Sequence, residues 1–131
     1  MGYGRLVSAI VIDDDQYNVD LFCEFLEIIS VKVLGQGNNG LQAVELYEKY
    51  KPDIVFLDLL MPDYDGFYAL ENIRQVNPQA FIVVITAVVD KNSRQKLEDL
   101  SPNQIIQKPF EPEQITEIVT KFSEQKANLR C

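Results

Sequence analysis

The chain has 131 residues, a length typical of one domain with a full hydrophobic core. Hydrophobic residues make up 47% of it and charged residues 24%, which excludes a disordered chain. The formal net charge of −8 argues against binding to nucleic acid or to an anionic membrane by this chain alone. The chain contains no histidine, so histidine-based metal or acid–base chemistry is excluded. With two cysteines and no signal-peptide core, we expect a reduced, cytoplasmic protein.

Segments of strand and helix character alternate along the chain. Continuous apolar runs predict strands at residues 6–12, 31–34, 54–57, 81–85 and 103–107. Apolar residues at helical spacing predict five helices: from Asp15 to about Ile29, between a Gly/Asn-rich turn at 35–40 and Pro52, between a loop at 62–66 and Pro78, over about 91–100, and over about 113–125. In the second helix, Ala43, Val44, Tyr47 and Tyr50 are expected to face inward.

This alternation predicts an α/β protein with a doubly wound (βα)5 architecture. Strands that are apolar throughout are typical of a parallel sheet covered by helices on both faces. With right-handed crossovers, we expect a flavodoxin-like fold whose five parallel strands lie in the order 2-1-3-4-5, with a ligand site at their carboxyl ends. The predicted domain spans residues 6–125, after a disordered lead at 1–5 and before a frayed tail at 126–131.

Four of the predicted strands end in polar residues of complementary kinds. Asp13 and Asp14 follow the first strand, Asp58 the third, Thr86 the fourth and Lys108 the fifth. Three carboxylates at the same edge of the sheet form a binding site for Mg²⁺, which prefers oxygen ligands. Asp58 is central and can act as a nucleophile toward a phosphoryl group, while the metal and Lys108 neutralise the charge of that group.

Each of these residues has a simpler explanation when it is taken alone. Asp15 is expected to cap a helix, and Asp63 and Asp65 to serve the turn before Gly66. A lone Thr86 is an ordinary strand residue, and a lone lysine is usually a surface charge. The simpler explanation has to account for all four strand ends at once, and this favours a site.

The same residues carry a family resemblance over about residues 6–122. The chain resembles a response-regulator receiver domain of two-component signalling in the motifs Val11-Ile12-Asp13-Asp14-Asp15, Asp58-Leu59-Leu60-Met61-Pro62-Asp63-Tyr64-Asp65-Gly66, Ile85-Thr86-Ala87 and Lys108-Pro109-Phe110. The resemblance implies that Asp58 is the phosphoacceptor and that Asp13 and Asp14 position Mg²⁺. It also implies that the backbone carbonyl of Leu60 is a metal ligand, that Thr86 and Lys108 contact the phosphoryl group, and that the Lys108-Pro109 bond is cis.

The chain departs from the family pattern at three positions. Ile105 stands where the family often has an aromatic residue coupled to the threonine, so the switch is expected to be muted or carried by other packing. Leu60 and Val88 are apolar at positions that influence how water reaches the phosphate, so the lifetime of the phosphorylated form is expected to be unusual.

The predicted function is a phosphorylated switch. A histidine kinase or phosphotransfer protein would donate the phosphoryl group to Asp58, the polar helix at about 91–100 would move, and a downstream effector protein would read the change. The expected state is a monomer or weak homodimer, with self-phosphorylation and autodephosphorylation as its only catalytic activities.

Several alternatives stay open at this point. A phosphorelay shuttle, a phosphate sink and a degenerate receiver that binds partners without phosphorylation all agree with the sequence. A metal-dependent phosphohydrolase is disfavoured because Leu60 occupies the position of its second carboxylate. A flavodoxin-like cofactor binder is disfavoured because residues 15–18 lack the phosphate cradle that it needs.

Overall fold

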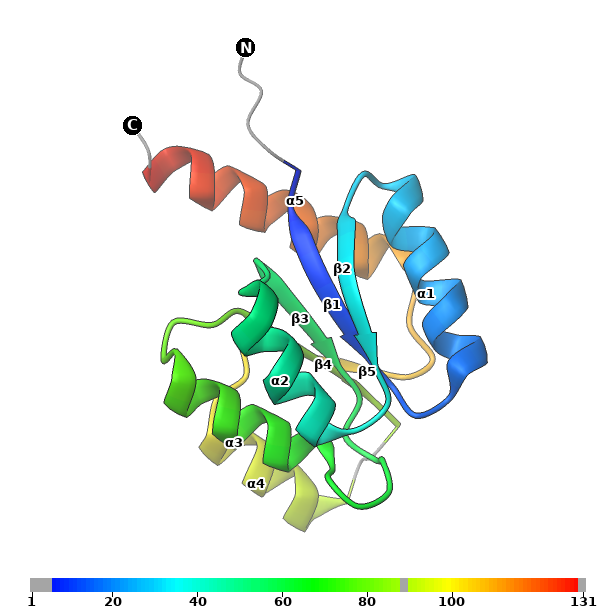
Figure 1. Cartoon of the computed structure of the whole chain (residues 1–131), viewed down its shortest axis with the longest axis vertical. Coiled ribbons are helices and arrows are strands. Elements are labelled where there is room, and N and C mark those ends of the chain that lie inside the picture. The colour runs from blue at the N-terminus through cyan, green and yellow to red at the C-terminus, as the bar shows by residue number, and fades with distance from the viewer. Residues whose placement is uncertain (1–5, 88–89, 130–131) are drawn as a thin grey trace.

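The computed structural model describes residues 6–87 and 90–129, which fold into one sheet between two layers of helices (Figure 1). The strands are β1 (Ser8–Ile12), β2 (Lys32–Gly37), β3 (Ile54–Leu57), β4 (Ile82–Thr86) and β5 (Gln104–Gln107). The helices are α1 (Gln16–Ile28), α2 (Gly40–Tyr50), α3 (Gly66–Val76), α4 (Lys91–Leu100) and α5 (Pro112–Leu129). All strand pairs are parallel and the order is β2-β1-β3-β4-β5, so the predicted fold is confirmed.

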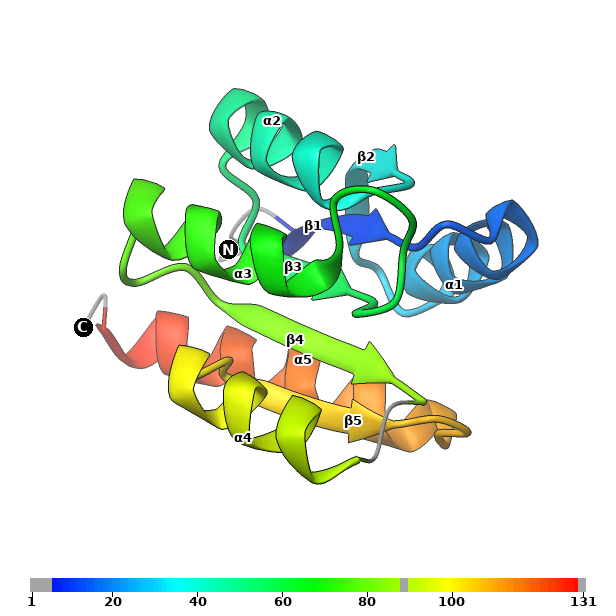
Figure 2. The same ribbon diagram turned by 90° about the horizontal axis from the view of Figure 1, so that it is seen from below.

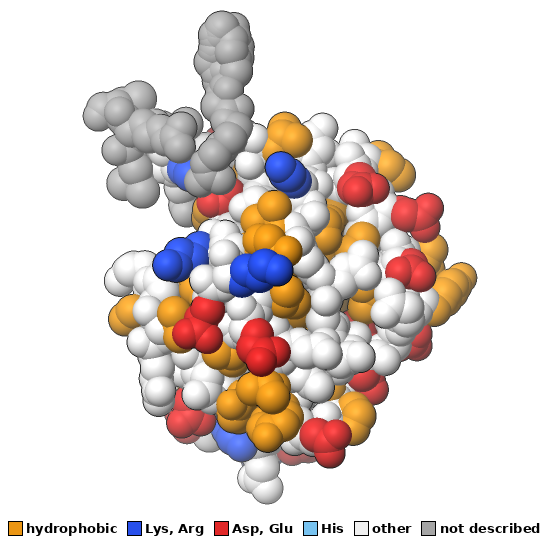
Figure 3. All heavy atoms as spheres, viewed as in Figure 1, with side chains coloured by type: hydrophobic (Ala, Val, Ile, Leu, Met, Phe, Trp, Pro, Cys, Tyr) orange, Lys and Arg blue, Asp and Glu red, His pale blue; other side chains and the backbone are white. Residues whose placement is uncertain are grey.

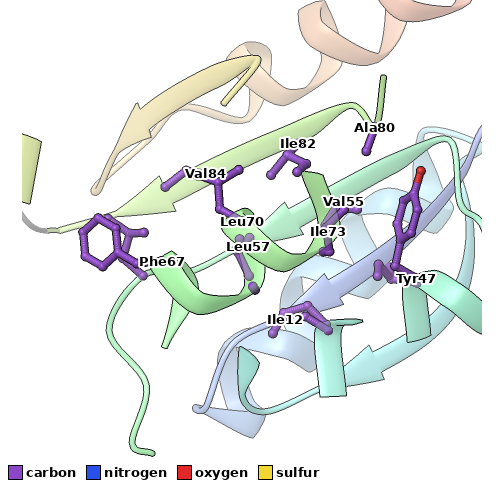
Figure 4. Close-up of a cluster of buried hydrophobic side chains, with 14 of the residues drawn as sticks. Ile12, Tyr47, Val55, Leu57, Phe67, Leu70, Ile73, Ala80, Ile82 and Val84 are labelled. Atoms are coloured by element: carbon purple, nitrogen blue, oxygen red, sulfur yellow. The ribbon is translucent and has the colours of Figure 1, made fainter. Parts of the chain in front are cut away.

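Strand residues alternate between two hydrophobic clusters, one on each face of the sheet. Helices α2, α3 and α4 cover one face of the sheet (Figure 2). Ile10 and Ile12 belong to the cluster on this face. Figure 4 shows Ile12 in this cluster with Tyr47, Leu70 and Ile73. The intervening residues of the strands face α1 and α5, and that cluster comprises Ala9, Val11, Val19, Cys23, Leu26, Phe56, Ile115 and Val119 with their neighbours. Burial on both faces explains why these strands are apolar throughout.

Side-chain caps fix where four helices begin, and so where the preceding loops end. The carboxylate of Asp15 accepts from the backbone N–H groups of Tyr17 and Asn18 at the start of α1, as expected. Asn39, Asp65 and Asp90 cap α2, α3 and α4 in the same way. Each cap satisfies a helix N–H that otherwise has no partner, which orients the loops at the carboxyl edge of the sheet.

The prediction for the second strand and the turn after it was wrong. β2 continues through Gly35 to Gly37, where a turn was expected, and its pairing with β1 shifts by one residue between Ala9 and Ile10. A Cβ on Gly35 would lie 3.0 Å from a methyl carbon of Leu46, and one on Gly37 would lie 2.9 Å from Ile12. These glycines allow α2 to pack closely on the strand, so their role is packing and not turn formation.

Two other expectations near the helix ends were also wrong. Tyr50 is 38% exposed at the end of α2, where an inward position was predicted. The last helix continues to Leu129, so residues 126–129 do not form the expected tail. An ion pair between Lys126 Nζ and Asp53 Oδ1 at 2.8 Å holds this extra turn to the body of the domain. The predicted lead at 1–5, Val88 and Cys131 lie outside the described residues.

None of the helices in residues 6–87 and 90–129 has the length and apolar content needed to span a bilayer.

Candidate phosphoacceptor and metal site

The first two acids of the site follow β1 directly. The N–H of Asp13 donates to the carbonyl of Gly37 at 3.1 Å, which extends the pairing of β1 and β2 into the site. One carboxylate oxygen of Asp13 accepts from the N–H of Asp15 at 3.0 Å. Asp13 is half-buried and Asp14 is exposed, so the pair spans from the sheet edge to solvent.

Asp58 lies next to them because β3 is the neighbour of β1. Its N–H donates to the carbonyl of Ile12 at 3.0 Å, and its Oδ1 accepts from the N–H of Leu59 at 2.9 Å. The side chain is only 12% exposed. The backbone of two adjacent strands therefore holds the carboxylate in place at the center of the rim.

The carboxylates of Asp13, Asp14 and Asp58 each offer an oxygen atom, and these oxygens lie within 4.8 Å of one another. Burial raises the pKa of Asp58 from 3.8 to about 6; Lys108 opposes this rise, and Asp13 and Asp14 add to it. Three acids at this spacing repel one another unless a proton or cation is shared. The residues present thus fit a hard divalent cation such as Mg²⁺, which takes oxygen ligands.

Lys108 supplies the positive charge at the end of β5. Its Nζ lies 3.4 Å from Oδ2 of Asp13 and 3.9 Å from Oδ1 of Asp58, and the side chain is 29% exposed. The backbone N–H of Lys108 donates to the backbone carbonyl of Thr86 at 2.9 Å, which brings the ends of β4 and β5 together. The Lys108-Pro109 peptide bond is cis, as the resemblance implied. Thr86 is 2% exposed at the same edge of the sheet.

The loop after Asp58 is closed at both ends by glycines. A Cβ on Gly66 would lie 2.3 Å from the carbonyl oxygen of Asp58, and one on Gly40 would lie 2.3 Å from the carbonyl oxygen of Asp65. The backbone N–H of Gly66 donates to the carbonyl oxygen of Leu59 at 2.9 Å. These close approaches require glycine, and no local pattern in the sequence indicates them.

The structure also locates the other residues that were singled out from the sequence. Asp65 caps α3 and Asp63 has a φ of 67°, so both serve the turn as expected. The side chain of Leu60 is 60% exposed beside the site. Ile105, at the position where an aromatic residue was expected, is half-buried against the cluster on the α4 side of the sheet.

The profile of the response regulator receiver domain matches residues 9–120. The chain belongs to this family. As a receiver domain it is 30% identical to the chemotaxis protein CheY of Thermotoga maritima over 115 residues, which cover 88% of this chain and 96% of that protein. It is 29% identical to the sporulation initiation phosphotransferase F of Bacillus subtilis over 121 residues, covering 92% of this chain and 98% of the other.

Solved receiver domains share the fold. A CheY-like receiver domain protein from Methanospirillum hungatei superposes on this receiver with a TM-score of 0.85 at 21% identity, covering 94% of this chain and 98% of the other. The receiver domain of the sensor histidine kinase PA1611 from Pseudomonas aeruginosa, solved with a magnesium ion in its active-site cleft, gives a TM-score of 0.80 at 22% identity over 88% of this chain and 95% of that chain. Receiver domains are signalling switches and not enzymes in the usual sense.

Proposed function

We propose that this receiver accepts a phosphoryl group on Asp58 from a phosphohistidine of a histidine kinase or phosphotransfer protein. The observation that carries the proposal is the convergence of three acids and one lysine at the carboxyl edge of the sheet. An ordinary cluster of solvated surface acids would not include an acid like Asp58, whose side chain is only 12% exposed and whose pKa is raised to about 6.

The chemistry follows from the residues around the acceptor. A carboxylate oxygen of Asp58 attacks the phosphorus atom, the bond from phosphorus to the donor nitrogen breaks, and the donor imidazole leaves with the electron pair of that bond. Lys108 lies close enough to Asp58 to neutralise the phosphoryl oxygens, and the Thr86 hydroxyl donates to one of them. Asp13, Asp14, Asp58 and the Leu60 carbonyl would hold a Mg²⁺ ion, which would supply further charge neutralisation.

The output is a change in partner binding. Phosphorylation adds about −1.5 to −2 charge at the rim. The Thr86 side chain moves toward the phosphate, and α4 shifts between two packings because it has a single fully buried anchor, Leu97. The receiver then binds or releases a downstream effector protein. As a switch of this kind, the protein would act in the cytoplasm together with its kinase.

Similarity to sporulation initiation phosphotransferase F supports a second role, a shuttle that passes the phosphoryl group onward. A shuttle returns its phosphoryl group from Asp58 to a histidine phosphotransfer protein, whereas a terminal switch loses it to water.

The decisive experiment incubates the chain with Mg²⁺ and acetyl phosphate and measures its intact mass. We expect a gain of one phosphoryl group in the parent and none in Asp58→Asn. Asp63→Asn is the matched control: it removes an acid from the following loop, where a positive φ suits asparagine, and it should label like the parent. Equal labelling of Asp58→Asn would refute the assignment, and release of many phosphates per chain would favour a hydrolase.

A further inference from the structure

A cavity of about 310 Å³ lies at the amino end of the sheet, at the opposite end from Asp58. Three segments line it: the end of α2, the turn between α3 and β4, and the last part of α5. Lys126, in the turn of α5 beyond residue 125, forms part of one wall. The lining contains none of the residues of the phosphoacceptor site, so this cavity is separate from that site.

Hydrogen bonds hold the turn between α3 and β4 in place beside the cavity. The backbone carbonyl of Asn77 accepts from the N–H of Ala80 at 3.0 Å, and its side-chain oxygen accepts from the N–H of Gln79 at 2.9 Å. The side-chain amide of Asn77 donates to the Tyr47 hydroxyl at 2.9 Å, which joins the turn to α2. The guanidinium of Arg74 donates to the carbonyl of Ala80. Because these bonds tie two of the walls together, the cavity is preformed, as ligand sites usually are.

The apolar part of the cavity is largely aromatic. Phe81 and Phe122 are half-buried, and their rings meet edge-on with centroids 5.2 Å apart. Pro52 and Ala80 are buried and complete this side of the lining. A planar ring of a ligand can therefore lie against ring edges and aliphatic carbon atoms. The volume is at the lower limit for ligand sites, so it suits a ligand with a single ring.

The charged part of the cavity is basic. Lys51 is exposed and forms no ion pair with any of the described residues. Lys126 binds Asp53, the only acid among the described lining residues, and its Nζ lies 5.8 Å from the centroid of the Phe122 ring. An ammonium group has three N–H donors, so Lys126 keeps donors beyond the one that Asp53 takes. Figure 3 shows Lys and Arg side chains gathered near the amino ends of β1 and β3, whereas acidic side chains lie over α1.

We infer that this cavity binds a small aromatic carboxylate. The ring of the ligand lies against Phe81 and Phe122, and its carboxylate accepts from the ammonium groups of Lys51 and Lys126. An aliphatic carboxylate lacks the ring contacts and a neutral aromatic compound lacks the charge contacts, so both bind more weakly. The inference rests on the amino end of the sheet and does not depend on phosphorylation of Asp58.

The test titrates the protein with sodium benzoate at constant ionic strength and follows its amide resonances. We expect saturable shifts at Lys51, Gln79 and Gln125, with a dissociation constant of about 1 mM, which is reasonable for so small a ligand. Lys51→Gln should weaken binding about fivefold, because it removes a solvent-exposed charge contact. The matched control is Lys49→Gln, which removes an exposed lysine two residues earlier that does not line the cavity, and it should bind benzoate like the parent.

Any one of several results would overturn the inference. Benzoate could give no saturable shifts, or benzyl alcohol or acetate could bind as tightly as benzoate, which would remove the need for the charge or for the ring. Lys51→Gln could bind like the parent, or Lys49→Gln could lose as much affinity as Lys51→Gln. Shifts confined to Lys108 and its neighbours would place benzoate at the phosphoacceptor site instead.

Discussion

Each end of the sheet carries a partly buried lysine–aspartate pair, and the two pairs are built differently. At the amino end, Asp53 accepts from Lys126 at 2.8 Å, from the Ser8 N–H at 2.9 Å and from the Ser8 hydroxyl at 3.2 Å. The Ser8 hydroxyl in turn accepts from the N–H of Asp53. Here one carboxylate is balanced by one ammonium group and also accepts from Ser8 at the start of β1, so this pair has a structural role. We call the Asp53–Lys126 pair the clasp.

At the carboxyl end, the balance of charge is different. Three acids share one lysine, whose ammonium lies 3.4 Å from Asp13 and 3.9 Å from Asp58. The pKa of Asp58 is raised there, chiefly by burial. Uncompensated charge, and not the presence of a buried ion pair, therefore distinguishes the site from the clasp.

The largest expected difference between the two ends is in phosphorylation. Lys108→Gln should slow labelling by acetyl phosphate about 100-fold, because a charged donor near the transferring oxygens is lost. Lys126→Gln removes the equivalent lysine at the other end and should label at the parent rate. Time courses of intact mass check both variants, and equal rates in the two would remove the functional distinction.

The next difference concerns stability. Asp53→Ala leaves the Ser8 N–H and Lys126 without their acceptor, so the free energy of unfolding should fall by about 2 kcal/mol. Asp14→Ala removes an exposed acid from the crowded end and should leave stability unchanged or higher. Urea unfolding in EDTA measures both, and a larger loss in Asp14→Ala would reverse the comparison.

Mg²⁺ should stabilise the folded protein only through the carboxyl end of the sheet. At ten times its dissociation constant, Mg²⁺ should raise the free energy of unfolding of the parent by about 1.4 kcal/mol. Asp53→Asn should keep this response, whereas Asp13→Asn should lose most of it. Thermal unfolding with and without Mg²⁺ is the measurement, and an undiminished response in Asp13→Asn would place the ion elsewhere.

The smallest effect is a pH dependence without metal. The folded carboxyl of Asp58 binds its proton more tightly than the unfolded one, so it lowers stability as the pH rises from 3.8 to about 6. This rise in the pKa of Asp58 corresponds to a loss of at most about 3 kcal/mol in the free energy of unfolding, and solvent screening reduces the loss to about 1 kcal/mol. In EDTA, Asp58→Asn should therefore be more stable than the parent by about 1 kcal/mol at pH 7.5.

That advantage should disappear below pH 3.8, where the carboxyl is protonated in both states of the parent. Urea unfolding across this pH range tests the sign. A variant that is less stable than the parent at pH 7.5 in EDTA would show that burial does not penalise the charged form of Asp58.

The sequence predicted the carboxyl end of the sheet better than the amino end. Asp13, Asp58 and Lys108 end separate strands, and strand order alone brings such residues to one rim. The clasp at the amino end was not predicted, because Lys126 pairs with Asp53 only through an extra turn of α5 that no local pattern indicates.

Close packing also escaped prediction. Gly35 and Gly37 indicate a turn when they are considered locally, yet they lie in a strand because the side chains of α2 need their space. Phe22, Phe25 and Phe110 are only half-buried, and no sequence pattern could indicate this, since periodicity reports which face a residue occupies and not whether a neighbour covers it. Both cases depend on contacts between distant segments.

The two glycines that close the loop after Asp58 have a consequence for protein engineering. Gly66 and Gly40 fix its ends against the Asp58 and Asp65 carbonyls, and Leu59 and Met61 are buried in the core, so residues 59–65 are not freely exchangeable. A loop transplanted from another receiver would have to keep both glycines, the capping Asp65 and apolar residues at the buried positions 59 and 61.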